Sequence, residues 1–284
     1  GQTWSRFRPR VEAPDVVYGI GQSADGSVWF GGSGTRRFDG ESWTTVLEPR
    51  ELLMGSWADV VYSDRKKNLW IGTRNYGVLK FDGTSWSRHD MQTGLAGNRT
   101  RAILQTKDGS LWVATDKGIS RYDGKTWTTH ALPVELGSVS WDGLRESSDG
   151  SLWINRDGVN EAIRYRPDTN SPETTISVSP GEVSQRGTTT ITWEGVDSWQ
   201  QTANADIQFS WRLDEDSWSP FSPKRTHTLT SMPRGEHSFQ VRARDQDFNT
   251  DPTPASITFT VTPPVWAQAW FLALMAAAAA AIGL

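Results

Sequence analysis

The chain has 284 residues, with 29 basic and 33 acidic side chains, and is long enough for two domains of ordinary size. It has no long basic run, so we expect no nucleic-acid partner. Cysteine is absent, which excludes disulfides, thiol nucleophiles and zinc–thiolate sites, and none of the four histidines has metal-site or catalytic-triad spacing. We therefore expect no cofactor, no bound metal and no catalytic residue here.

Aromatic residues recur with a period of about 41 residues through the first part of the chain. The first series is Trp29, Trp70, Trp112 and Trp153. The second series is Trp43, Trp86 and Trp127, and the third is Phe38, Phe81, Tyr122 and Tyr165. Self-similarity at this period indicates a propeller, a solenoid or an array.

Each repeat predicts four short antiparallel strands. In the third copy they occupy residues 101–106, 110–115, 119–122 and 125–130, with Asp-Gly turns at 108–109 and 123–124. Four such strands form the blade of a β-propeller. A parallel β-helix is the structural rival, but its coils are usually shorter than this period and need fewer hairpin turns. We therefore expect an all-β fold with propeller repeats over residues 1–167.

The two ends of the array are atypical. The fourth copy, from Asp149, lacks the "DGxxW" outer strand, and "TWSRF" (residues 3–7) looks like that strand on its own. Two interpretations remain open. Either residues 3–7 close a four-bladed ring, or the chain is part of a longer propeller, which is the interpretation we favour.

A linker at residues 168–174 leads to a second domain, residues 175–262. Alternating strands are expected at 175–180, 188–195, 207–214, 226–231, 237–245 and 255–261, which is typical of an antiparallel immunoglobulin-like sandwich. Arg242 and Arg244 are expected to point outward from it. "DQDFNTD" (245–251) spaces oxygen side chains as a calcium loop would, but Thr250 replaces the required glycine and Ser256 the required glutamate, so a turn is favoured.

The last segment, residues 265–284, is apolar apart from Gln268. Twenty such residues in a helix would cover about 30 Å, the thickness of a bilayer core. We expect a truncated transmembrane helix that anchors the chain in a membrane. The alternative is a buried, alanine-rich helix of a soluble domain.

With these elements placed, the chain resembles a known arrangement. "LWIGT…GVLKFDGTSW" (69–86) is similar to the two-component regulator propeller repeat. The stretches 209–221, 232–245 and 263–271 resemble the three-Y domain, whose tyrosines correspond here to Phe209, Trp211 and Phe239. The resemblance implies the extracytoplasmic sensor region of a bacterial inner-membrane receptor, with propeller and sandwich in the periplasm or extracellular space. A cytoplasmic output module, commonly a histidine kinase, would follow.

Recurring positions indicate scaffold, so ligand-binding residues are expected where the copies differ. The repeat tryptophans and Asp-Gly pairs are interpreted as packing and turn chemistry. The variable connections 48–57, 90–100 and 131–141, and the loops between second and third strands, are expected to open on one face of the propeller. The candidates are Trp57, Arg74, Asn75, Tyr76, Asp116, Lys117, Trp141, Arg156, Asp157 and Asn160.

The rings, charges and amides of these candidates suit a polar oligomer such as a glycan. The favoured hypothesis is a membrane-tethered, non-enzymatic sensor that dimerises through its sandwich and relays ligand binding through the helix. The alternative is a surface-anchored glycan-binding or adhesion propeller without signalling output. A propeller lyase or hydrolase is a third and less favoured hypothesis.

Overall fold

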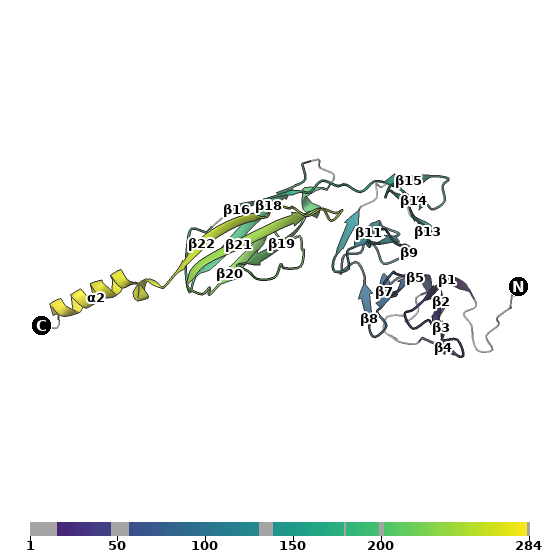
Figure 1. Cartoon of the computed structure of the whole chain (residues 1–284), viewed down its shortest axis with the longest axis horizontal. Helices are drawn as coiled ribbons and strands as arrows, with labels where there is room; N and C mark the ends of the chain where they lie inside the picture. The colour runs from purple at the N-terminus through teal and green to yellow at the C-terminus, as the bar shows by residue number, and fades with distance from the viewer. Residues whose placement is uncertain (1–15, 47–56, 131–138, 179, 199–201, 283–284) are drawn as a thin grey trace. The chain divides into compact units, whose positions relative to one another are not determined.

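The computed structural model describes residues 16–46, 57–130, 139–178, 180–198 and 202–282. The chain divides into two compact units, Gly1–Pro167 and Asp168–Leu284 (Figure 1). The proposed strand at residues 3–7, and most of the connections 48–57 and 131–141, lie outside the described residues.

Among its described residues, the first unit contains four antiparallel sheets, in each of which the strands follow chain order. The first two sheets are β1 (Val17–Gln22), β2 (Val28–Gly32), β3 (Arg36–Phe38), β4 (Trp43–Thr45), and β5 (Ala58–Ser63), β6 (Leu69–Thr73), β7 (Val78–Phe81), β8 (Trp86–His89). The other two are β9 (Thr100–Gln105), β10 (Leu111–Thr115), β11 (Ile119–Tyr122), β12 (Trp127–His130), and β13 (Val139–Glu146), β14 (Leu152–Arg156), β15 (Ala162–Tyr165). The predicted all-β, propeller-like repeat is confirmed.

The Asp-Gly pairs are turn chemistry. Gly26 and Gly109 adopt φ of +84° and +92°, a conformation that favours glycine. The preceding aspartate closes the turn: the Asp25 carboxylate accepts hydrogen bonds from the Ser23 hydroxyl and the Ser27 backbone N–H and pairs with Arg37. These partners, the Ser23 hydroxyl first, lower the pKa of Asp25 to about 2. An equivalent set surrounds Asp108.

The repeat tryptophans pack between neighbouring blades. The Trp70 ring lies 5.6 Å from the His89 ring of its own blade and 5.8 Å from the Tyr122 ring of the next blade. Trp112 repeats this arrangement one blade later, and Trp29 packs on aromatic rings of the second blade. Glycine permits neighbouring blades to approach closely near their first strands. A Cβ on Gly72 of the second blade would lie only 2.5 Å from Cγ2 of Thr100 in the third blade.

The two end blades leave a face uncovered among the described residues. The inner strands contact one another in the order β1, β5, β9, β13. Ile20 on β1 is 61% exposed, whereas its equivalents on the second and third blades, Val61 and Ile103, are buried. At the other end Trp153 is 41% exposed, unlike the other three tryptophans of its series. Blade-to-blade packing thus buries an apolar face wherever a neighbour is present.

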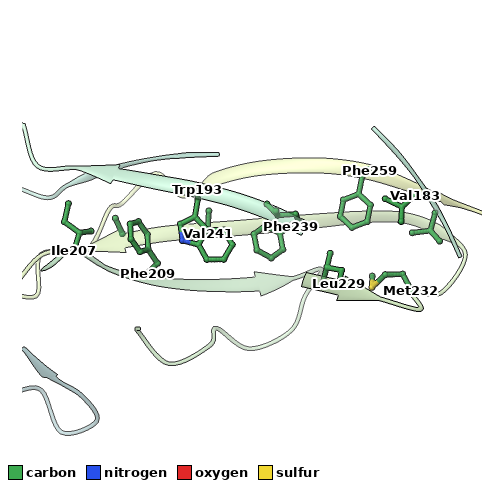
Figure 2. Close-up of a cluster of buried hydrophobic side chains, with 12 residues drawn as sticks. Val183, Trp193, Ile207, Phe209, Leu229, Met232, Phe239, Val241 and Phe259 are labelled. Carbon is green, nitrogen blue, oxygen red and sulfur yellow. The ribbon is translucent and has the colours of Figure 1, made fainter. Parts of the chain in front are cut away.

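The second unit is a two-layer sandwich. One sheet has the order β16 (Glu173–Val178), β18 (Thr188–Val196), β20 (Thr226–Thr230), and the other β17 (Glu182–Ser184), β22 (Ala255–Thr262), β21 (Gly235–Arg244), β19 (Gln208–Leu213). Figure 2 shows Trp193, Phe209 and Phe239 between the layers, where all three are fully buried. The short strand β17 was not predicted, and it pairs with β22 in parallel.

Arg242 and Arg244 point away from the core as expected, but not into open solvent. They belong to a column in which guanidinium groups alternate with aromatic rings at 4.1–5.5 Å. The column contains, in order, Arg212, Trp218, Arg242, Phe221, Arg244 and Phe248. Residues 217–222 supply two of its rings, because hydrogen bonds between Trp211 and Ser219 hold that segment along β19.

The first residue of the second unit is fastened to the turn between β21 and β22. The backbone N–H of Asp168 donates to Asp247 Oδ2 at 2.8 Å, and Asn249 Nδ2 donates to the Asp168 carbonyl at 3.0 Å. Asp245, whose carboxylate accepts from the Asn249 amide, is buried, and burial raises its pKa to about 6. Residues 245–251 therefore form a latch for the incoming chain.

The apolar C-terminal segment begins as a short 3-10 turn, Val265–Ala267, and the α-helix α2 runs over Ala269–Ile282. The expectation of one helix from residue 265 is wrong, because Gln268 is extended and its side-chain amide donates to the Pro263 carbonyl. Of the residues described, none lies in a helix that is both long and apolar enough to cross a membrane.

We predict that Trp70→Ala costs the first unit about 3–5 kcal/mol of unfolding free energy, because the buried indole fills an interface between blades. Trp153→Ala removes the equivalent but exposed ring and should cost less than about 1 kcal/mol. Denaturant unfolding of the two variants measures the difference. Equal losses would contradict the packing role.

A second prediction concerns His89, which accepts a hydrogen bond from the Trp127 indole N–H at 3.1 Å. Burial lowers its pKa to about 4, so the folded unit disfavours the protonated ring. The free energy of unfolding should therefore be about 3 kcal/mol lower at pH 4 than above pH 6.5, because over this range the unfolded chain binds the proton more tightly than the folded unit does. His89→Gln keeps an acceptor but no titrating group, and its unfolding free energy should decline less over this range.

Candidate ligand-binding site

The candidate site lies where the first strand of each blade begins and the second strand ends. The pairing of Ala58 with Thr73 and of Thr100 with Thr115 places these two points side by side. In an antiparallel meander the loop between second and third strands therefore lies at the start of the first strand. We call this end of the blades the upper end.

Every inner strand carries an irregularity at its upper end. Strand pairing skips Tyr18 in β1, Asp59 in β5 and Arg101 in β9, and in β13 it skips residues 140–143. Such β-bulges redirect a side chain out of the regular alternation and are over-represented at barrel rims and next to active sites. The same backbone position thus presents a different residue in each blade.

A first cluster, consisting of Tyr18, Trp57, Asp59 and Arg74, joins the first two blades. Arg74 Nε donates to both carboxylate oxygens of the buried Asp59, at 2.9 and 3.1 Å. The guanidinium carbon lies 4.5 Å from the Trp57 ring centroid and 5.6 Å from that of Tyr18. The hydrogen bond to Asp59 raises the pKa of Arg74 above its ordinary value. This cluster combines two aromatic rings with one ion pair.

A second cluster, consisting of Arg101, Trp141 and Asp157, joins the third and fourth blades. The Arg101 guanidinium carbon lies 4.4 Å from the Trp141 ring centroid. Its Nη2 is 4.0 Å from Asp157 Oδ2, which is beyond hydrogen-bonding distance. The second cluster therefore repeats the chemistry of the first, but with a looser ion pair.

The two clusters exchange acid and base at equivalent positions. Asp59 and Arg101 occupy the same bulge position, while Arg74, Asp116 and Asp157 occupy the same loop position after the second strand. Arg74 bonds to the bulge residue of its own blade, whereas Arg101 faces the loop residue of the next blade.

The other candidates lie in the same loops without joining either cluster. Tyr76 stacks with Arg88 at 5.4 Å. The Asp116 backbone N–H donates to the Arg99 carbonyl, which fixes its loop, and Arg156 pairs with Glu161. Asn75, Lys117 and Asn160 are exposed.

Three bulge residues of these clusters, Tyr18, Asp59 and Arg101, are missing from the sequence-based candidates. That prediction looked for binding residues in the loops, whereas these begin strands. A signal exists nevertheless: eleven residues before Trp29, Trp70, Trp112 and Trp153 stand Tyr18, Asp59, Arg101 and Asp142. At this position of the repeat the residue is polar in all four copies but varies among them, and this variation marks the position.

The upper end offers recognition chemistry through rings, carboxylates and guanidinium groups. Among the described residues, no group of three or more histidine or acidic side chains is arranged to hold a metal ion. In the latch at 245–251 the side chains of Asp245, Asp247 and Asn249 make hydrogen bonds to Asp168 and within the loop.

Comparison with known proteins returns a family match over part of the chain. Residues 94–117 match the two-component regulator propeller family, which covers the third inner strand, its hairpin partner and the loop after it. Comparison with curated proteins gives no significant match.

Comparison with solved structures returns several similar chains. The extracellular domain of a putative hybrid two-component system from B. thetaiotaomicron has 19% identity and a TM-score of 0.49, over 87% of this chain and 38% of that one. The extracellular domain of a putative one-component system from the same organism has 15% identity and a TM-score of 0.35, over 86% and 37%. PorZ of Porphyromonas gingivalis has 13% identity and a TM-score of 0.41, over 91% and 47%. The chain spans less than half the length of each.

We predict that Arg74→Met destabilises the first unit by about 3 kcal/mol, because it leaves the buried Asp59 carboxylate without its partner. Arg145→Met, which breaks the exposed pair with Asp142, should change stability by less than about 1 kcal/mol. Denaturant unfolding at pH 7 tests both. Restoration of stability in the Asp59→Asn, Arg74→Met double variant would identify the unpaired charge as the cause.

Proposed function

We propose that the chain is the ligand-sensing region of an extracytoplasmic bacterial receptor, with a polar oligomer such as an oligosaccharide as its ligand. The observation that carries the proposal is the bulge at the upper end of the first three inner strands, β1, β5 and β9. A repeat that needed only to fold would have no reason to present a ring, an acid and a base at one backbone position. The family match over residues 94–117 supports a sensor-type propeller.

The ligand would bind across the upper end, on the exposed ring faces and the charged edges of the two clusters. Aromatic faces can stack on the apolar faces of sugar rings, and fixed carboxylate and guanidinium groups can hydrogen-bond to hydroxyls. Because the binding groups belong to different blades, one ligand would connect several blades.

The second unit would carry the signal toward a membrane. We assign the sandwich to the three-Y, immunoglobulin-like class, with Phe209, Trp211 and Phe239 at the tyrosine positions. Helix α2, whose apolar side chains such as Leu272 and Leu274 are exposed, would continue into the inner membrane. The sandwich would relay ligand binding, as a homodimer, to a cytoplasmic output module, commonly a histidine kinase. Further blades would cover the exposed faces at Ile20 and Trp153.

Binding of oligosaccharides to the purified chain tests the site. Tyr18→Ala and Trp141→Ala should each weaken binding of a recognised oligosaccharide at least tenfold in calorimetric titrations. Lys125→Ala, in the turn at the opposite end of the third blade, should bind as the unaltered chain does. Unchanged affinity in both aromatic variants would remove the upper end as the binding site.

A chimera separates a sensor from an adhesin. The chain would be joined through its C-terminus to the cytoplasmic kinase of a receptor whose output is measured by a transcriptional reporter. Sensing predicts that the recognised oligosaccharide changes reporter expression, and that Trp141→Ala abolishes the response. Binding without any response would favour the adhesion alternative.

A further inference from the structure

Arg101 is a buried arginine of the upper end whose pairing is incomplete. Its side chain is only 9% exposed, and its Nε has no acceptor among the described residues. Arg74, in the neighbouring blade, uses its Nε to bond both oxygens of Asp59. Burying a guanidinium without a matched hydrogen-bond acceptor costs free energy, and binding of an anion at Arg101 would offset that cost.

The nearest carboxylate, that of Asp157, does not hydrogen-bond to Arg101. Asp157 Oδ2 is 4.0 Å from Arg101 Nη2, its side chain is 45% exposed, and it lies in the short loop between β14 and β15. Ion pairs of this kind, with one exposed partner and no hydrogen bond, contribute little. Asp157 is therefore a carboxylate that stands near the guanidinium and can be displaced at small cost.

The Trp141 ring packs against the guanidinium group of Arg101. The guanidinium carbon lies over the Trp141 ring, 4.4 Å from its centroid. A guanidinium can stack on an aromatic ring and still use its N–H groups for hydrogen bonding. The edge of a guanidinium matches a carboxylate through two parallel hydrogen bonds of about 2.7–2.9 Å.

We propose that Arg101 binds a carboxylate of the ligand, which displaces Asp157, so that the recognised oligosaccharide contains a uronic acid. This inference rests on the proposed function, because it takes the upper end as the binding site. It assigns Arg101 as the residue that selects acidic over neutral sugars, with Trp141 as its support and Asp157 as an internal competitor for the same guanidinium.

Calorimetric titration of the purified chain with oligogalacturonates and oligoglucuronates, each beside its methyl ester, tests the proposal. At least one acid should bind, and its ester should bind at least tenfold more weakly. Arg101→Gln should reduce binding of the acid to the level of the ester, and Asp157→Asn should increase it. Arg145→Gln, which alters an exposed arginine of the fourth blade, should leave it unchanged.

Arg101→Lys keeps the charge but loses the two-point hydrogen bonding, and it serves if the glutamine variant does not fold. It should weaken binding of the acid about tenfold. The proposal is overturned if neither acid binds, if acid and ester bind alike, or if both Arg101 variants bind the acid as the unaltered chain does. Binding of neutral oligosaccharides that depends on Tyr18 and Trp141, without binding of acids, would overturn this inference and leave the proposed function standing.

Discussion

The contact between a buried tryptophan and the aromatic ring of the next blade is the interaction on which the first unit depends. Trp70 and Trp112 each close an interface that also buries aliphatic residues of two sheets. Because this contact recurs with the period of the sequence, the same kind of aromatic packing sets the spacing between successive blades. The connections between blades carry less of this packing, although Leu95 in the connection 90–100 is buried in the same cluster as Trp70.

The inner strands offer little room for functional side chains along most of their length. Neighbouring blades approach so closely there that a Cβ on Gly19 would lie 2.6 Å from the Val61 backbone nitrogen. A bulge at the strand start takes the extra residue out of the regular alternation and so redirects its side chain. Tyr18, Asp59 and Arg101 occupy the bulge position of the first three inner strands, where a ring, an acid and a base replace one another.

Features of the fold that are determined by residues close in sequence could be predicted, whereas features determined by distant residues could not. The blade strands and Asp-Gly turns could be predicted, because hydrophobic alternation and turn chemistry act within a few residues and repeat in every copy. The bulges could not, since a bulge depends on pairing with a second strand. The buried state of Arg244 was equally out of reach, because the rings that cover it include Phe221, which is distant in sequence. The break at Gln268 depends on one side-chain hydrogen bond to Pro263.

The latch at the start of the sandwich has a mechanical consequence. The chain enters the sandwich at Asp168, which is tied to the turn that precedes β22, and the far end of β22 leads through Pro263 and Pro264 to α2. A pull on the entering segment is therefore applied near one end of a strand whose other end continues toward the helix. Because β22 is paired with β21 on one side and with β17 on the other, the part of the load that reaches it would be resisted in shear by both sets of hydrogen bonds.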